Sequence, residues 1–497
     1  MLRLLWPLLF LPLLYFLWLA LHAAPAALRL ANGAEMQWVD CWFDRPLFSR
    51  PVHCGRLLTS PESGEKPDQF SLPVVYVPAF FWHRTQPPIL YIAGGPGGAT
   101  GLDAEGVSAW LGWLGWVNWP ADTIFYDQRG VGLSRPSLAC PEVLDRRREL
   151  LVTELPSEEK YQQARAAGQA CLQRLQSEGW NLQRFNTLIN AGDTRDLIDS
   201  LGLDAWQLYG VSYGTRVALQ IMRGQPPGLR AVILDSLYPP LRHAEKNDAW
   251  LLNRSLRMFT RSCQFLADCD FSPERLNADL RHIFKQLELK PLKVKLKDRS
   301  AGEIIDVAFG RDDLAWLIFE SQYLWSNIAL LPAAVTALAD GRITQEMQQM
   351  MQESIDNLLD DSLSEAVFSS VDCADNGDFS RQQAEQALQQ FPLVATIKQH
   401  DWRYSACRYW DSGDTGSVFR RPVVSDVPTL LLAGEFDPVT PPEWAEDSLS
   451  TLSSAYLFIA PGIGHGVLDS DDCTQHLTQA FLQNPLLPAV PDCLRAW

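Results

Sequence analysis

The sequence predicts an α/β fold in which a mainly parallel sheet carries helices on both faces and is interrupted by an inserted helical cap. Three observations predict this architecture. Short apolar runs alternate with amphipathic helical stretches, the pattern of buried parallel strands joined by helices. One such run passes through a glycine-flanked serine straight into a helix. The strand signal gives way to Gln- and Glu-rich helical patterns over 241–421 and returns from Val427.

We therefore divide the chain into four parts. Residues 1–26 are a signal peptide or N-terminal anchor, 36–240 the first part of the α/β core, 241–421 the cap, and 422–497 the second part of the core. The core is expected to begin with an antiparallel entry over 36–82 and to contain a helical region over 138–182. Its buried strands are predicted at 89–92, 123–126, 205–209, 231–235, 427–432 and 455–459, with an amphipathic helix at 187–201.

Composition excludes one broad class of function. The chain has 497 residues, 47% hydrophobic and 20% charged, with a net charge of −17. This composition supports a large globular core. Nucleic-acid binding is not expected, because the one short basic run, 146–148, is typical of a solvated helix face. The sequence does not indicate an oligomeric state.

The N-terminus has the composition of a targeting segment. Arg3 precedes residues 4–21, which are apolar, and Ala24-Pro25-Ala26 resembles a signal-peptidase site, with cleavage near Ala23 as an alternative. The apolar run also approaches the length that spans a bilayer. We therefore expect an exported protein, periplasmic or secreted, or membrane-attached if the segment is retained.

The ten cysteines agree with export. An even number of cysteines in an exported chain favours structural disulfides formed in an oxidising compartment. A metal site is not expected, because there is no C-x-x-C and no adjacent histidine pair. Near neighbours suggest the pairs Cys41–Cys54, Cys140–Cys171, Cys263–Cys269, Cys373–Cys407 and Cys473–Cys493.

The glycine-flanked serine is Ser212, in the run Gly-Val-Ser-Tyr-Gly at 210–214. An apolar run precedes it and a helical pattern follows it. A strand–turn–helix of this kind is a nucleophile elbow, in which the tight turn needs glycine at the flanking positions. Ser212 is therefore the candidate nucleophile.

A serine hydroxyl needs a general base, and the base needs an orienting acid. Asp437 and His465 each follow a predicted strand, so they should share the ligand-binding edge of the sheet with Ser212. His465 alone among the eight histidines is flanked by glycines just after a strand in this order. The order serine, acid, histidine is that of the α/β-hydrolase fold.

Two details of this triad stay open in the sequence. Glu435 is a rival for the acid; we prefer Asp437, because its proline-bounded turn would fix a short carboxylate. Thr440 is placed to hydrogen-bond that carboxylate or the imidazole, although a plain turn hydroxyl is an equal interpretation.

The glycine run 94–98 follows another predicted strand and fits an oxyanion loop. Tetrahedral intermediates of acyl transfer need two backbone N–H donors. We assign them to Gly95, with Gly94 as the alternative, and to Tyr213, the residue after the nucleophile. A P-loop is excluded, because no Lys-Ser/Thr follows the glycines. Asp127 is expected to lie in an ion-paired turn, and Trp110, Trp113, Trp116 and Trp119 either wall an apolar pocket or pack against the cap.

These motifs resemble those of the proline iminopeptidase and tripeptidyl aminopeptidase group of α/β-hydrolases. The likeness lies in 94–97, 127–134, 210–215 and 437–441, together with 371–375 in the cap, and is nearest to the exported subgroup with a TAP-like C-terminal region. Ala93 departs from the histidine that often precedes the glycine run. The resemblance implies a serine exopeptidase that cleaves peptides from a free N-terminus, with a cap carboxylate holding the ammonium: Glu320, Asp372 or Asp375.

The sequence thus predicts an exported serine hydrolase, an aminopeptidase whose partner is a peptide substrate and which needs no metal or organic cofactor. An esterase or lipase using the same Ser212, Asp437 and His465 is the alternative. A non-enzymatic cell-surface binding protein is disfavoured, because all three members of the triad are present in order.

Overall fold

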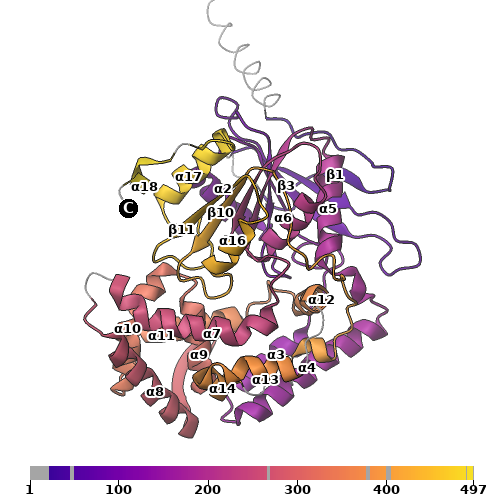
Figure 1. Cartoon of the computed structure of the whole chain (residues 1–497). Helices are drawn as coiled ribbons and strands as arrows, with labels where there is room; N and C mark the ends of the chain where they lie inside the picture. Colours follow the sequence, from indigo (N-terminus) through magenta and orange to yellow (C-terminus); the bar gives the residue numbers. More distant parts are fainter. Residues whose placement is uncertain are drawn as a thin grey trace, which may run out of the picture.

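The structure, a computed structural model, describes residues 22–44, 50–265, 269–376, 381–398, 405–488 and 490–495. The apolar part of the predicted leader, up to residue 21, lies outside these residues. Two bodies stack on one another: a sheet flanked by helices and, below it in Figure 1, a mainly helical body. Of the helices in the described ranges, none is both long and apolar enough to cross a membrane.

Nine strands in the described part of the chain form one sheet, which confirms the predicted fold class. The first three strands and β5 pair antiparallel, and every later pairing is parallel. In spatial order the strands are β1 (Glu35–Val39), β2 (His53–Leu58), β3 (Ser71–Val77), β5 (Thr123–Tyr126), β4 (Ile89–Ile92), β6 (Trp206–Val211), β7 (Leu229–Asp235), β10 (Thr429–Gly434) and β11 (Ala455–Ala460).

Helices bury both faces of this sheet, as expected for a parallel sheet rich in Val, Ile and Leu. On one face α5 (Thr187–Ser200), α6 (Tyr213–Arg223) and α16 (Pro442–Ser448) share an apolar cluster with the strands. On the other face α2 (Ala104–Val117) and α17 (Asp472–Gln483) share a second cluster. The short α18 (Asp492–Arg495) follows α17. Helices therefore pack on both faces of the sheet, and this packing fixes the positions of the strand ends.

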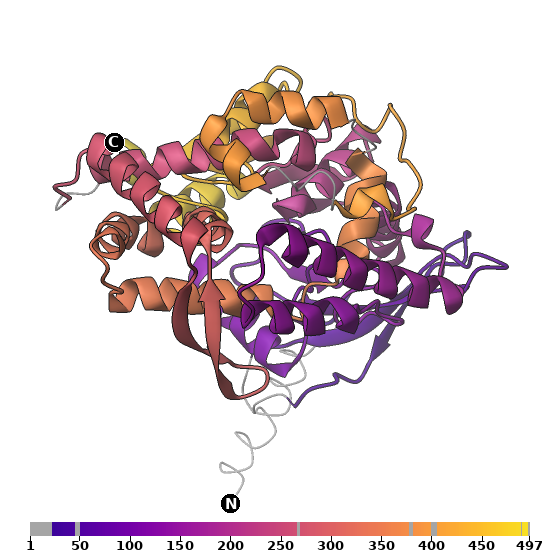
Figure 2. The same ribbon diagram turned by 90° about the horizontal axis from the view of Figure 1, so that it is seen from below.

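The region between β7 and β10 forms a second body with its own apolar cluster, although the apolar side chains of Glu365–Asn376 pack in the cluster of the sheet. Most of it is helical, but it also contains a two-stranded antiparallel hairpin that we did not expect, seen as the pair of arrows in Figure 2. Its elements are α7 (Ala244–Arg261), α8 (Pro273–Leu289), β8 (Leu292–Asp298), β9 (Glu303–Phe309), α9 (Arg311–Ser321), α10 (Trp325–Ala339), α11 (Gln345–Leu358), α12 (Glu365–Asn376), α13 (Arg381–Gln389) and α14 (Pro392–Lys398).

Two helices that precede the serine also lie with this body. α3 (Pro141–Leu151) and α4 (Ser157–Ser177) lie next to α12, with which they line a common hollow, as Figures 1 and 2 both show. Arg147 of α3 pairs with Glu365 of α12 at 2.7 Å, and Arg148 pairs with Asp298 of the hairpin at 3.2 Å. The cap is therefore assembled from two segments of the chain, around 141–177 and after 240.

All five predicted disulfides are present. Cys140–Cys171 joins the start of α3 to α4. Cys373–Cys407 ties α12 to the segment that returns toward the sheet. Such links confine the unfolded chain, and more so the more residues they enclose. The two with the largest sequence separations, 31 and 34, both lie in cap segments.

A buried ion pair fixes the loop after β5. Arg129 Nε and Nη2 each donate to the Asp193 carboxylate of α5 at 2.7 Å. The two side chains are 4% and 6% exposed. A bidentate pair compensates the loss of hydration only while both partners are present.

We therefore expect Asp193→Ala to lower the free energy of unfolding by about 3–5 kcal/mol, because it leaves a buried guanidinium without its main partner. Asp306→Ala, which breaks an exposed pair with Lys295, is the matched control and should leave it nearly unchanged. Urea unfolding with the disulfides intact measures both. The double variant Arg129→Met/Asp193→Leu should recover stability; equal stability of Asp193→Ala and the control would contradict this account.

Candidate active site

Ser212 lies in the sharp turn between β6 and α6 with φ 56° and ψ −123°. A non-glycine residue holds this conformation only where the surroundings enforce it. Here the enforcement is close packing. A Cβ at Gly210 would come within 2.7 Å of the Gly214 carbonyl oxygen, and one at Gly214 would overlap the carbonyl oxygen of Ile92. The two flanking glycines therefore let the elbow press against the neighbouring strand, while Ser212 itself stays partly exposed.

Asp437 and His465 are in direct contact. His465 Nδ1 lies 2.8 Å from Asp437 Oδ2, and the Asp437 side chain is fully buried. Burial alone would raise the pKa of Asp437, but His465 and the surrounding donors hold that pKa well below its usual range. Burial lowers the pKa of His465, and the Asp437 carboxylate outweighs this, so the net shift is upward. The pair is thus poised to stabilise a cationic imidazole.

The turn after β10 holds the Asp437 carboxylate in place. The backbone N–H groups of Val439 and Thr440 donate to Oδ1 at 2.9 and 2.8 Å, and the Thr440 hydroxyl donates to Oδ2 at 2.8 Å. The rival Glu435 instead accepts the N–H of Gly462 at 3.0 Å. Asp437, and not Glu435, is therefore the acid that contacts the histidine.

The end of β7 joins the serine and histidine segments, a feature that our sequence reasoning missed. The carbonyl oxygen of Asp235 accepts the N–H of Ser212 at 2.9 Å. Its carboxylate accepts the N–H groups of Val467 at 2.7 Å and Leu468 at 2.9 Å, and the Tyr209 hydroxyl at 3.2 Å. Burial raises the pKa of Asp235 to about 6. The sequence does contain a signal for this role, because Asp235 is an acidic residue at the end of the strand next to the elbow.

The neighbouring residue strengthens this junction. Ser236 has φ 59°, and its hydroxyl accepts the N–H of Gly466 at 2.9 Å. On the cap side, the N–H of His465 donates to the carbonyl oxygen of Tyr323 at 3.1 Å, and the two rings lie 4.9 Å apart. The histidine loop is therefore held between the sheet and the end of α9.

The glycine run lies directly against the serine. A Cβ at Gly94 would be 3.0 Å from the Cβ of Ser212, so the backbone approaches as close as a glycine allows. Gly95 has φ 116°, a conformation that favours glycine. The carbonyl oxygen of Gly97 accepts the N–H of Ser364, so the start of α12 seats on this loop.

Tyr213 begins α6, and its buried side chain is locked from the cap side. Its hydroxyl lies 2.9 Å from both the Thr187 hydroxyl and the Asn190 amide. Thr187 in turn donates to Asp375 of α12 at 2.5 Å. The backbone at Tyr213 is thus positioned by a chain of contacts that ends in the cap. Polar groups of this kind in the interior fix geometry when all are satisfied.

Two expectations about flanking residues have different outcomes. The turn after β5 is ion-paired as expected, through Arg129 and Asp193. Within it the Asp127 carboxylate accepts the N–H groups of Thr100 and Leu133, both at 2.7 Å, and so shapes the loop backbone. The four tryptophans pack neither against the cap nor around the serine. They lie on the sheet face that α2 covers, where Trp110, Trp113 and Trp119 contact Tyr91, Tyr209 and Phe125.

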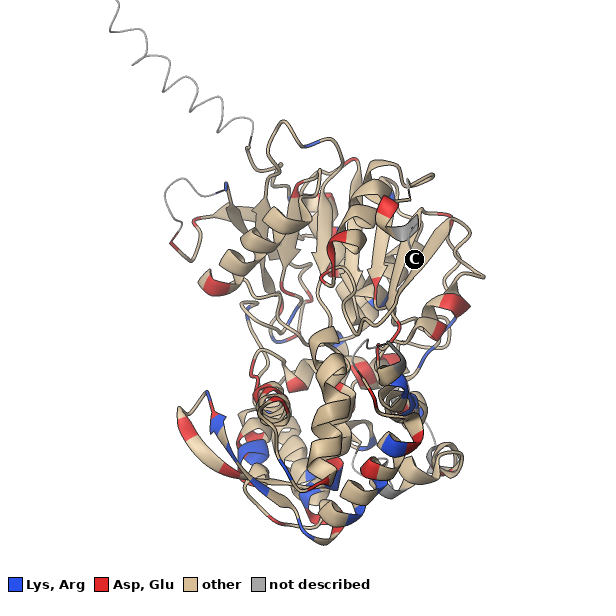
Figure 3. Cartoon of the chain, turned by 90° about the vertical axis from the view of Figure 1, so that its left-hand side faces the viewer, with Lys and Arg blue, Asp and Glu red and all other residues tan. Residues whose placement is uncertain are grey.

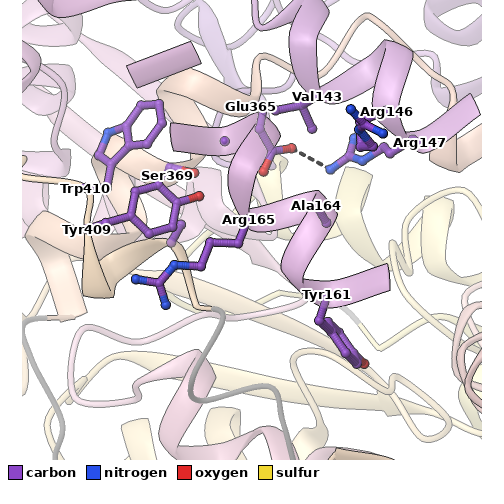
Figure 4. A pocket seen from close by; sticks show the side chains of 12 residues that line it. Val143, Arg146, Arg147, Tyr161, Ala164, Arg165, Glu365, Ser369, Tyr409 and Trp410 are labelled. Atoms are coloured by element: carbon purple, nitrogen blue, oxygen red, sulfur yellow. Dashed lines mark hydrogen bonds and ion pairs between the residues drawn. The ribbon is translucent and has the colours of Figure 1, made fainter. Parts of the chain in front are cut away.

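A hollow of about 180 Å³ between α3, α4 and α12 contains none of the predicted site residues. In Figure 4 Glu365 points toward Arg147 and its neighbour Arg146, whereas Arg165 lies apart from them, near Tyr409. Arg147 bonds to Glu365, and the Arg165 guanidinium lies over the Tyr409 ring. This hollow is a seam between cap segments. Across the described residues, no group of three or more His, Cys, Asp or Glu is arranged to hold a metal.

Asp235→Asn should slow labelling of the protein by a fluorophosphonate roughly ten- to a hundredfold, because one amide oxygen cannot hold both N–H groups and the His465 loop shifts. Tyr209→Phe removes one hydroxyl contact, at 3.2 Å, and leaves both N–H contacts in place. It serves as the matched control, with near-normal labelling. For each variant, the labelling rate is measured from samples quenched at successive times, and folding is checked by the midpoint temperature of thermal unfolding. Unchanged labelling by a folded Asp235→Asn protein would refute the positioning role.

Several known proteins are similar to this chain. Residues 395–493 match the family model described as TAP-like protein. A putative hydrolase, YuaR, of Escherichia coli K12 is 23% identical over 87% of both chains. A tripeptidyl aminopeptidase of Streptomyces coelicolor is 30% identical over 44% of this chain and 41% of its own. An esterase structure from Exiguobacterium antarcticum covers 84% of this chain and 97% of its own, with 13% identity and a TM-score of 0.38. Residues 395–493 are thus similar to TAP-like proteins, and the sheet with its covering helices has the α/β fold that the sequence predicts.

Proposed function

We propose that the protein is an exported serine aminopeptidase that cleaves peptides from a free N-terminus through an acyl-enzyme. The observation that carries the proposal is the Asp437–His465 pair, 2.8 Å apart, at the sheet edge where Ser212 occupies a strained elbow. The five disulfides support a body that folds outside the cytoplasm.

The reaction has two halves, acylation of Ser212 and hydrolysis of the acyl-enzyme, and each catalytic group acts once in each half. Ser212 Oγ forms a bond to the scissile carbonyl carbon while its proton passes to His465 Nε2. Asp437 stabilises the imidazolium, and the N–H groups of Gly95 and Tyr213 donate hydrogen bonds to the developing oxyanion. His465 then returns the proton to the leaving amine as the C–N bond breaks. Water repeats the sequence on the ester and releases the N-terminal fragment.

The three cap carboxylates differ in their availability to a substrate ammonium. Asp375 is 1% exposed and already bonded to Thr187 and paired with Arg216 at 3.8 Å. The Asp372 carboxylate accepts a hydrogen bond from the Asn376 side-chain amide at 2.5 Å, and the positive charge of Arg216 also acts on it. Both carboxylates are therefore engaged by the buried contacts that hold α12.

Glu320 is better placed. It lines a cavity of about 450 Å³ together with Tyr323, whose ring lies against His465. No Lys or Arg is among the described residues that line this cavity. The Ser354 hydroxyl donates to Glu320 at 2.5 Å, and the Trp316 and Asn357 side chains also hydrogen-bond to it, so its partners are all uncharged. Burial raises the pKa of Glu320 to about 7, and a bound ammonium would restore its charge. We assign the ammonium of the substrate to Glu320.

Glu320→Gln should lower kcat/KM for a free-amine peptide anilide by roughly thirtyfold or more, the cost of removing one partner of a buried charge pair. The N-acetylated anilide should be a poor substrate for the wild-type protein and for Glu320→Gln alike, with little difference in kcat/KM between them. Glu353→Gln is the matched control, because Glu353 lines the same cavity but already accepts Asn327 and Gln349.

The competing outcomes are distinct. Ser212→Ala supplies the blank for every substrate. An equal loss on free and N-acetylated peptides, or no loss in Glu320→Gln, would contradict the assignment of the ammonium. Faster turnover of short acyl esters than of any free-amine peptide would favour the esterase alternative instead.

A further inference from the structure

Three consecutive aromatic side chains are exposed in the loop between β3 and β4. Phe80, Phe81 and Trp82 are 39%, 47% and 65% exposed. The rings of Phe80 and Trp82 stack at 4.8 Å, and Phe81 meets Trp82 edge-on at 5.0 Å. A contiguous exposed aromatic surface is unusual on a soluble domain and marks a contact site. We call these three residues the aromatic cluster.

The N-terminal segment meets the body at this cluster. His22 is 1% exposed, and its ring lies 6.4 Å from that of Phe80 and 6.2 Å from that of Phe81. The His22 carbonyl oxygen lies 2.7 Å from His53 Nε2. Further on, Trp38 Nε1 donates to the carbonyl oxygen of Pro25 at 2.9 Å. Residues that flank the predicted cleavage sites are therefore part of the folded body.

The cluster lies at the edge of the sheet opposite the candidate active site. Val77 at the end of β3 pairs with Thr123 at the start of β5, so the loop that follows sits where the parallel strands begin. Ser212 and His465 follow the ends of parallel strands. A surface that occupied the cluster would leave the site and the cap facing away from it.

Other apolar side chains are exposed at the same edge. Leu28, 44% exposed, bonds through its N–H to Ser200 just before β6. Leu486 and Leu487 are 70% and 75% exposed, and Tyr456 at the start of β11 bonds to the Leu486 carbonyl oxygen. In Figure 3 the charged residues gather along the cap helices and are sparser on the sheet end of the molecule.

We propose that the N-terminal segment is retained as an anchor and that the aromatic cluster rests in the interface of a lipid bilayer. Residues 4–21 are eighteen residues without a charge, close to the roughly 20 that a helix needs to span. They enter the described body at His22, beside the cluster. Aromatic rings, tryptophan above all, favour the headgroup region, where an apolar body and a polar tip are both satisfied.

The cysteine pairing gives a clean probe. All ten cysteines are paired, so Trp82→Cys in the full chain carries one free thiol for the fluorophore NBD. Trp325→Cys is the matched control, because Trp325 is 58% exposed on α10 of the cap. Both proteins are reconstituted into phosphatidylcholine–phosphatidylglycerol vesicles. Doxyl-labelled lipid and aqueous iodide are the two quenchers.

We expect lipid quenching several-fold stronger at position 82 than at 325, and iodide quenching in the reverse order. Mass spectrometry of the vesicle-bound protein should find residues 4–21 still attached. Equal iodide quenching at both positions would overturn the proposal. So would the finding that the protein has lost residues 4–21 and does not bind the vesicles. Position 82 shielded from both quenchers in a cross-linkable dimer would instead assign the cluster to a second copy of the chain. Because no outcome depends on hydrolysis, a failure here is separable from a failure of the proposed function.

Discussion

The candidate site depends on the last residue of β7. Asp235 uses its backbone to hold the serine elbow and its carboxylate to hold the histidine loop, although the two segments are some 250 positions apart in sequence. Strand pairing places Val211 on one side of Asp235 and Leu432 on the other. The parallel sheet thus sets the spacing of the serine, acid and histidine segments, and one buried carboxylate fixes their orientation. Four donors contact this carboxylate: the N–H groups of Val467 and Leu468 and the hydroxyls of Tyr209 and Ser236.

The cap contacts the site at three separate points. Ser364 seats on the glycine run, Asp375 fixes Tyr213 through Thr187, and Tyr323 contacts His465. A body that only covered the site would need none of these contacts. We infer that the cap both shapes the cavity for a substrate and completes the geometry of the groups below it. The disulfides in the cap segments serve the same end by limiting how far these contacts can open.

Much of this could be predicted, and the failures have physical causes. The strands, the elbow and the order of Ser212, Asp437 and His465 depend on local apolar patterns and short turns, which a sequence displays directly. The hairpin at 292–309 carries an alternating Leu-Lys-Val-Lys-Leu-Lys pattern, but the helical patterns around it hid the signal. The docking of α3 on the cap rests on long-range pairs such as Arg147–Glu365, which no local pattern encodes. The role of Asp235 follows from register between strands, and register is a property of the fold.

The central claim is that Ser212 is a nucleophile activated by His465. The most direct measurement treats the full chain with a fluorophosphonate at a series of pH values and maps the adduct by peptide mass spectrometry. The adduct should lie on Ser212. Because neutral imidazole is the active base and the pKa of His465 is raised, the rate should rise with pH and reach half its plateau above pH 6.5. An adduct on another residue, equal labelling of a folded Ser212→Ala protein, or a rate that does not change with pH would contradict the account.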